Sequence, residues 1–245
     1  MDAAYLADPY LRTAETQVAG PHADGVLVAR TIFYPQGGGQ PGDRGTVELS
    51  DGTMIEVYTT RYGPERQTAL LVCRQDDDAL PPALTSLTTG TKIVGHIDWP
   101  QRYTYMRVHT ALHLLSVVLP FPVTGGQIGD GEGRLDFNID DASLDKTALS
   151  EQLQAVVDAD HPVTQRWISD AELDANPGLV KTMSVQPPRG SGKVRLVQIG
   201  DIDLQPCGGT HVASTAEIRT VIVSKIENKG RQNRRVRIKL LDDDA

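Results

Sequence analysis

The sequence lacks the features that mark membrane, secreted or disordered proteins. It has only two cysteines among 245 residues, Cys73 and Cys207, which argues against a disulfide framework and predicts a reducing, cytoplasmic setting. No apolar run approaches the roughly 20 residues that cross a bilayer, and no basic stretch leads into a hydrophobic one near the N-terminus. We therefore expect neither a membrane partner nor a signal peptide. A hydrophobic content of 39% and a charged content of 23% are ordinary for a globular protein.

Positive charge is scarce overall but gathers near the C-terminus. The formal net charge of −8 argues against a general nucleic-acid-binding protein. Residues 225–239 nevertheless hold seven basic side chains against one acid: Lys225, Lys229, Arg231, Arg234, Arg235, Arg237 and Lys239 against Glu227. The ordinary interpretation is a solvated strand face, and the alternative is a local site for phosphate groups.

The distribution of β-branched and turn residues predicts an α+β protein with two domains. Short segments separated by Gly, Pro or Asp predict strands over 25–34, 45–50, 53–60, 68–73 and 91–99, and hence a small β-barrel domain over residues 1–95. Residues 96–245 are expected to form an α+β domain with an antiparallel sheet. Its predicted helices cover 100–119, 143–160 and 169–175, and its predicted strands cover 134–140, 193–199, 217–226 and 234–241.

Two short motifs carry candidate metal ligands. In "HTALHLL", His109 and His113 lie four residues apart on a predicted helix, so their side chains share one face. The neighbouring leucines offer no partner for two buried imidazoles, and a metal ion would satisfy them. In "PCGGTH", Cys207 and His211 add a thiol and an imidazole, and thiolate with imidazole favours zinc over Mg²⁺ or Ca²⁺. Taken singly, each residue could instead be a core histidine or an ordinary loop residue.

Two common enzyme classes are disfavoured by residues that the motifs lack. Thr110 stands where the zinc proteases of the HExxH class carry their glutamate base, so a protease is a weak hypothesis. The glycine-rich stretch "FYPQGGGQPGDRG" lacks the Lys-Ser/Thr end of a phosphate-binding loop, which disfavours a nucleotide-binding enzyme. It is either a hairpin turn between two strands or a place where a ligand approaches the backbone closely.

Together, these motifs resemble the editing domain of alanyl-tRNA synthetase. The shared features are an aromatic-Tyr-Pro-x-Gly-Gly-Gly-Gln segment, His-x-x-x-His on a helix, and Cys-Gly-Gly-Thr-His. In length the chain is similar to the freestanding AlaX editing proteins of the medium-length type. One departure is Gln36, where the family leads us to expect an acidic residue.

The resemblance implies a hydrolase that deacylates tRNA(Ala) mischarged with serine or glycine, without ATP, in the cytoplasm. It implies Zn²⁺ held by His109, His113 and Cys207, with His211 as a fourth ligand or bound through water. Thr31 and Gln40 map near the amino-acid pocket beside Gly37, Gly38 and Gly39, and with His211 they are the candidate catalytic residues. The basic residues expected to bind tRNA are Lys225, Lys229, Arg231, Arg234 and Arg235.

The chemistry of editing adds a physical requirement. A site that hydrolyses seryl-tRNA and spares alanyl-tRNA cannot sort by size, because serine is the larger residue. It needs buried polar groups that the serine hydroxyl satisfies and alanine leaves unpaired. Thr31 or Gln40 could supply them.

Two other functions remain open on the sequence. One is a zinc-stabilised module that binds tRNA without catalysis, and the other is a zinc hydrolase acting on a different aminoacyl ester. The basic segment favours a tRNA substrate over a small one. The sequence leaves open whether zinc activates water or orients the substrate's amino group, and we expect a monomer.

Overall fold

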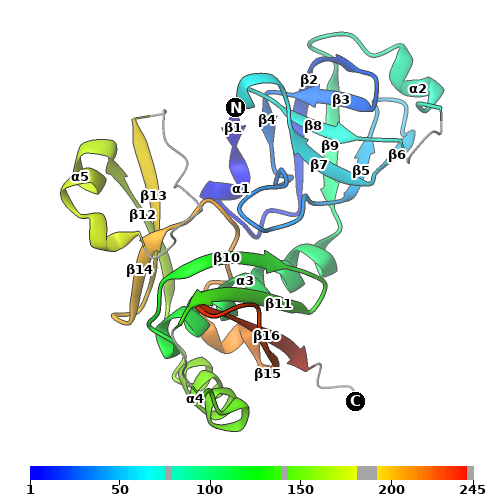
Figure 1. Cartoon of the computed structure of the whole chain (residues 1–245). Helices are drawn as coiled ribbons and strands as arrows, with labels where there is room; N and C mark the ends of the chain where they lie inside the picture. Colours follow the sequence, from blue (N-terminus) through cyan, green and yellow to red (C-terminus); the bar gives the residue numbers. More distant parts are fainter. Residues whose placement is uncertain (75–78, 140–142, 181–191, 242–245) are drawn as a thin grey trace. The chain divides into compact units, whose positions relative to one another are not determined.

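A computed structural model of the chain describes residues 1–74, 79–139, 143–180 and 192–241 (Figure 1). The chain divides into two compact units, Met1–Tyr103 and Thr104–Ala245. This boundary falls inside the long helix α3 (Trp99–Val118), whereas the boundary predicted from composition lies ahead of that helix. Across the described ranges, no helix combines the length and apolar character that a membrane crossing needs.

The first unit is built on a seven-stranded antiparallel sheet in the order β6-β5-β9-β2-β3-β8-β7. The edge strands β6 and β7 are separated only by Tyr58, so the sheet curls into a nearly closed barrel, as predicted. Its strands are β2 (Thr13–His22), β3 (Gly25–Val28), β5 (Gly45–Glu48), β6 (Met54–Val57), β7 (Thr59–Tyr62), β8 (Ala69–Val72) and β9 (Lys92–Ile97). The remaining elements are β1 (Asp2–Ala3), paired in parallel with β4 (Arg30–Thr31), and the short helices α1 (Ala4–Ala7), η1 (Pro64–Arg66) and α2 (Pro82–Thr85). Apolar side chains, including Val28, Val47, Leu71 and Cys73, fill the barrel.

A buried ion pair fixes the glycine-rich segment of the first unit. The Asp43 carboxylate accepts hydrogen bonds from the Arg102 guanidinium, at 2.9 Å from Nε, and from the Tyr34 amide. Arg102 also donates to the carbonyl oxygens of Pro9 and Ile32. Both charged side chains are at most 1% exposed. Arg102 therefore holds the segment through Asp43 and the neighbouring chain through Pro9 and Ile32.

The second unit packs helices against two antiparallel sheets. The four-stranded sheet has the order β10-β11-β16-β15, and the three-stranded sheet has the order β12-β13-β14. The strands are β10 (Val123–Ile128), β11 (Glu132–Asn138), β12 (Val163–Ser169), β13 (Lys193–Ile199), β14 (Asp203–Pro206), β15 (Thr220–Asn228) and β16 (Asn233–Leu241). The helices, besides α3, are α4 (Lys146–Asp158), α5 (Asp170–Ala175), η2 (Pro177–Leu179) and η3 (Thr215–Ile218).

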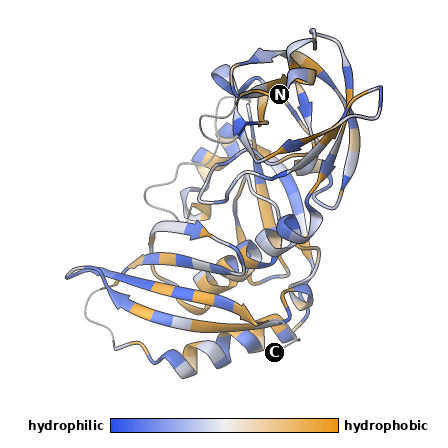
Figure 2. Ribbon diagram, turned by 90° about the vertical axis from the view of Figure 1, so that its right-hand side faces the viewer, coloured by the Kyte–Doolittle hydropathy of each residue, from blue (hydrophilic) through white to orange (hydrophobic). Residues whose placement is uncertain are grey.

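The helix α3 packs on β11 where a glycine allows it. A Cβ added at Gly133 would lie 2.7 Å from Val108 Cγ1 and 3.1 Å from Leu112 Cδ1. The absence of a side chain at this position lets the apolar face of α3 approach the sheet closely. Hydrophobic and polar residues alternate along the strands near the C-terminus (Figure 2), because one face of this sheet is buried and the other meets solvent.

The α+β class and the antiparallel sheets predicted from the sequence are confirmed, and four details are corrected. Residues 25–34 do not form one strand: β3 ends at Val28, and β4 leaves the barrel to pair with β1. Residues 53–60 do not form one strand either, because the chain turns at Tyr58 from β6 into β7, which pairs with β8. The strands β1, β2, β10, β12 and β14 were not predicted. The antiparallel strands of the second unit form two sheets rather than one. Residue 140, the end of a predicted strand, lies outside the described residues.

We predict that Asp43→Asn destabilises the first unit by about 3–5 kcal/mol, because it leaves the buried Arg102 charge without its partner. The control is Asp2→Asn, whose ion pair with Arg30 is 67% exposed on the aspartate side and should contribute less than about 1 kcal/mol. Urea unfolding curves of the two variants and the parent protein make the comparison. Equal midpoints for the two variants would contradict the structural role given to Asp43.

Candidate metal centre

The helix α3 supplies two of the candidate ligands. His109 and His113 lie one turn apart on the same face, both buried, with ring centroids 5.3 Å apart. The helix begins at Trp99 with Pro100 in its first turn, where the missing amide hydrogen of proline is not needed. The spacing predicted from the sequence therefore brings both imidazoles to one place.

The loop that follows β14 supplies the other two ligands. Arg195, a buried residue of β13, holds this loop by donating from Nη1 to the carbonyl oxygens of Cys207, at 3.1 Å, and Gly209, at 2.8 Å. The Cys207 amide in turn donates to the Arg195 carbonyl oxygen. One backbone amide and two backbone carbonyl groups of the loop are thus held by Arg195, so Cys207 and His211 have defined positions.

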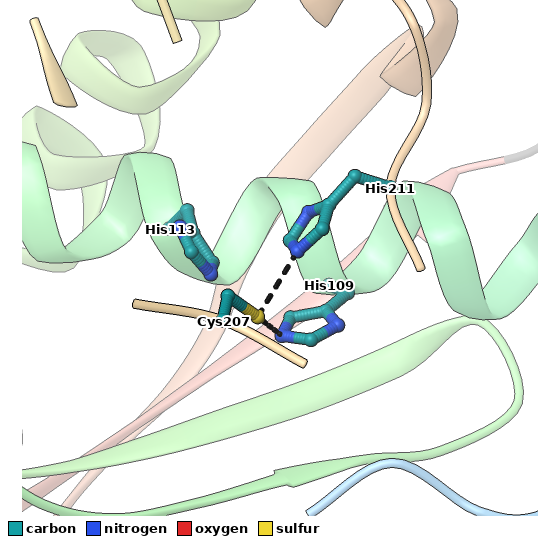
Figure 3. A group of neighbouring side chains, drawn as sticks. All are labelled: His109, His113, Cys207 and His211. Carbon is teal, nitrogen blue, oxygen red and sulfur yellow. Dashed lines mark hydrogen bonds between the residues drawn. The ribbon is translucent and has the colours of Figure 1, made fainter. Parts of the chain in front are cut away.

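The four side chains converge on one point (Figure 3). Their potential ligand atoms all lie within 4.8 Å of one another. Cys207 Sγ lies 3.5 Å from His109 Nε2 and 3.2 Å from His211 Nε2. The rings of His109 and His211 have centroids 4.2 Å apart. Such a set of one sulfur and three nitrogen donors, all turned inward, can hold a metal ion.

Neighbouring polar groups orient two of the imidazoles. His113 Nδ1 lies 3.0 Å from the fully buried Asp203 carboxylate, which can only accept, so Nδ1 carries a proton and Nε2 faces the cluster. The Thr110 hydroxyl donates to the Met106 carbonyl oxygen and must therefore accept from His211 Nδ1, 3.1 Å away. The lone pair of His211 Nε2 is then directed toward Cys207. This arrangement of outer hydrogen-bond partners is typical of metal-binding histidines.

The electrostatics of the cluster favour the metal-binding forms of Cys207 and His211. Burial raises the pKa of the Cys207 thiol, but the neighbouring His109 and His211 outweigh it and bring the pKa well below its ordinary value. Burial lowers the pKa of His211 well below its ordinary value. Burial also lowers the pKa of His113, but hydrogen bonds to Asp203 and Cys207 outweigh this and raise it to about 9. The carboxylate and thiolate beside His113 thus attract positive charge, which a bound cation would supply.

Four residues that support the cluster were missed by the sequence analysis: Thr110, Arg195, Asp203 and Gln205. Gln205 Nε2 donates to Asp203 Oδ2 at 2.8 Å and so fixes the carboxylate that orients His113. A signal for part of this set exists in the sequence. Asp203, Gln205 and Cys207 alternate in "DLQPC", and alternate residues of a strand share one side.

The other candidate site residues belong to the first unit. Thr31 is buried, and its hydroxyl accepts from the Phe33 amide at 2.9 Å. Gly37 and Gln40 exchange two backbone hydrogen bonds, which close a tight turn whose tip, Gly38 and Gly39, has φ angles of 57° and 85°. A two-residue turn with positive φ at both positions suits glycine. Gln40 is also buried.

The basic segment forms the hairpin of β15 and β16, and part of its charge is used within the protein. The Asp136 carboxylate accepts two hydrogen bonds from Arg235, at 2.7 and 2.9 Å. Arg237 donates to Glu227 at 2.7 Å, and this hydrogen bond, together with the charges of Lys229 and Lys225, lowers the pKa of Glu227 to about 2. Arg234 donates to Asn228 and to the Gly230 carbonyl oxygen across the turn. Lys225 and Lys229 also lie beside Glu227 but remain 64% and 40% exposed.

Comparison with known proteins places the chain in a family. Residues 194–237 match the model of the threonyl and alanyl tRNA synthetase second additional domain. The chain is 34% identical to the alanyl-tRNA editing protein AlaX-M of Methanosarcina acetivorans over 97% of its own length and 98% of that protein. It is 30% identical to AlaX-M of Saccharolobus solfataricus over 95% of each chain. Alanine–tRNA ligase of Archaeoglobus fulgidus is 31% identical, with 91% of this chain matching 24% of the ligase.

The similarity to the AlaX-M proteins extends over nearly the whole of both chains, and the motifs that resemble the family contain the four convergent candidate ligands. The chain therefore belongs to the AlaX-M family of alanyl-tRNA editing proteins.

Proposed function

We propose that the protein is a zinc-dependent trans-editing hydrolase that removes serine or glycine from mischarged tRNA(Ala) in the cytoplasm. The observation that carries the proposal is the convergence of His109, His113, Cys207 and His211 in a chain of the AlaX-M family. The reaction adds water to the ester carbonyl carbon and breaks its bond to the 3′-terminal ribose. The products are a free amino acid and uncharged tRNA, and no ATP is required.

Zinc fits the donor set. With bonds of about 2.3 Å to sulfur and about 2.0 Å to nitrogen, tetrahedral zinc separates these two ligand types by about 3.5 Å. Cys207 Sγ lies 3.5 Å from His109 Nε2 in the cluster. Thiolate and imidazole also disfavour the hard cations Mg²⁺ and Ca²⁺. His109, His113 and Cys207 would hold the ion and leave its fourth position open, as in catalytic sites.

A zinc ion bound there supplies a Lewis acid for ester hydrolysis. His211 could serve as a fourth zinc ligand, but in this proposal it transfers the proton between the attacking water and the leaving ribose oxygen. Thr110 fixes its Nδ1 proton, and the unprotonated Nε2 faces the cluster. His211 then accepts the proton that the attacking water loses and returns it to the leaving ribose oxygen. Arg195 holds the loop that carries both residues through the carbonyl oxygens of Cys207 and Gly209.

Specificity for serine is assigned to the first unit, with Thr31 and Gln40 as the polar groups and Gly37, Gly38 and Gly39 as the backbone of the pocket. The support is the resemblance of this segment to the family motif and the burial of both polar side chains. Tight packing of the segment through Asp43 and Arg102 suits a site that must recognise a single hydroxyl group. The protein is proposed to act as a monomer.

The first prediction from this proposal concerns Asp203. Asp203→Asn keeps the size of the side chain but removes the charge that orients His113, so zinc affinity should fall about tenfold to hundredfold. The exposed Asp201, two residues away, provides the control Asp201→Asn, which should bind zinc as the parent protein does. Competition with a chromophoric chelator measures both. Equal affinities in the two variants would remove Asp203 from the metal centre.

The second prediction concerns the ratio of rates on seryl- and alanyl-tRNA(Ala). An unpaired buried polar group costs about 1–3 kcal/mol, so each recognising group should give about a tenfold to hundredfold preference for serine. Thr31→Val or Gln40→Ala should bring the seryl rate toward the alanyl rate without loss of zinc. Thr215→Val, in the second unit, is the matched control, because it also removes a buried hydroxyl that donates to a carbonyl oxygen and accepts from an amide. An unchanged ratio in both Thr31→Val and Gln40→Ala would exclude these residues from recognition.

The third prediction concerns the basic hairpin. We assigned Lys225, Lys229, Arg231, Arg234 and Arg235 to tRNA binding. Arg234 and Arg235 also donate within the protein. The clean variant therefore replaces Lys225, Lys229 and Arg231 by alanine.

This variant should bind tRNA(Ala) more weakly and with a flatter salt dependence, because fewer phosphate counterions are released. Its hydrolysis of a minimal seryl ester should stay at the parental rate. Lys146→Ala, an exposed position on α4, is the control and should change neither property. Equal losses on tRNA and on the minimal ester would show that the hairpin residues support the fold instead.

A further inference from the structure

The edge strand β12 carries a half-exposed tryptophan beside the metal-ligand cluster. Trp167 is 50% exposed, whereas large aromatic residues are highly buried on average. Because β12 lies at the edge of the three-stranded sheet, one side of this residue has no neighbouring strand among the described residues. An isolated exposed aromatic residue is common and needs no explanation. The position of Trp167 within the sheet is what gives it significance.

The sheet register places Trp167 in line with Cys207. Trp167 lies directly opposite Arg195 on β13, and the Arg195 carbonyl oxygen accepts from the Cys207 amide. Directly opposed residues of antiparallel strands share one face, so these three side chains lie on the same side of the sheet. At about 4.8 Å between strands, the Trp167 and Cys207 backbones lie about 10 Å apart. This is comparable to the span from the base of a 3′-terminal nucleotide, across its ribose, to an acyl group on that ribose.

The surroundings of Trp167 are polar and positively charged. On the same face, Lys193 lies opposite Ser169 and diagonal to Trp167, and Gln165 accepts from Arg195. Within β12 and β13, both fully described, that face carries no acidic side chain. The helix α5, which follows β12, carries three acids, Asp170, Glu172 and Asp174, and Glu172 is held by Ser169 in its capping box. An aromatic ring among cations suits an anionic, base-bearing ligand rather than an apolar protein surface.

We propose that Trp167 is a stacking surface for the 3′-terminal base of the tRNA, with Lys193 beside it for the adjacent phosphate. The identity of the nucleic acid rests on the proposed function. Stacking of one base on an aromatic side chain is insensitive to the identity of the base, and every tRNA ends in the same nucleotide. Trp167 therefore contributes affinity and position, and it leaves the choice of amino acid to other residues. The base on Trp167 directs the ester on its ribose toward the cluster.

Intrinsic fluorescence tests the contact without any catalytic readout. The chain has two tryptophans, so Trp99→Phe leaves Trp167 as the only one, and Trp167→Phe leaves Trp99 as the matched control. Each variant is titrated with uncharged tRNA(Ala) and with the same tRNA shortened by its 3′-terminal nucleotide. Stacking predicts quenching of Trp167 by the complete tRNA only. Equal quenching by the two tRNAs, or none, would overturn the proposal.

Kinetics on seryl-tRNA(Ala) provide the second test. Trp167→Ala should raise KM about tenfold to hundredfold, while Trp167→Phe, which keeps an aromatic ring, should stay near the parental value. An unchanged KM in Trp167→Ala, with an active parent protein, would overturn the stacking surface alone. An inactive parent protein whose Trp167 is still quenched by the complete tRNA end would overturn the proposed hydrolysis and support the stacking surface.

Discussion

A buried histidine on an apolar helix needs a partner for each ring nitrogen, and the second unit is arranged around that need. The face of α3 that carries His109 and His113 is flanked by leucines, which offer no hydrogen bond. Asp203 accepts a hydrogen bond from Nδ1 of His113. The loop after β14 brings Cys207 and His211 close to the two histidines of α3. Because Arg195 holds this loop by two carbonyl oxygens, the backbone at Cys207 cannot move away from the imidazoles without breaking these hydrogen bonds.

The two units use buried charge for different purposes. In the first unit, Arg102 and Asp43 neutralise each other, and their further hydrogen bonds to Pro9, Ile32 and Tyr34 hold the backbone of this region. In the second unit, Asp203 lies on one side of His113 and Cys207 on the other, and both raise the pKa of this histidine. The negative potential at the cluster is therefore left for a cation to balance. On this account, the first arrangement maintains a recognition surface, and the second holds the reactive centre.

The sequence predicts the features that are local, and it misses those that depend on distant pairing. The i,i+4 spacing of His109 and His113 and the β-branched run of β13 are local signals, and β13 was predicted with its observed bounds. The segment 25–34 was predicted as one strand, because its break at β4 depends on parallel pairing with β1 near the N-terminus. Asp203 escaped notice for the same reason: its partner, His113, is 90 residues earlier in the chain. The alternation of Asp203, Gln205 and Cys207 in "DLQPC" indicates a shared side of a strand, but it does not identify that partner.

The central claim is that a single zinc ion in this cluster is required for hydrolysis of seryl-tRNA(Ala). The most direct measurement removes metal with a chelator and then titrates zinc back while following serine release. The account predicts that activity is lost, rises in proportion to added zinc and levels off at about one ion per chain. It also predicts no recovery in Cys207→Ala, with full recovery in Cys73→Ala, whose thiol lies in the barrel of the first unit. Full activity of the metal-free protein would contradict the claim.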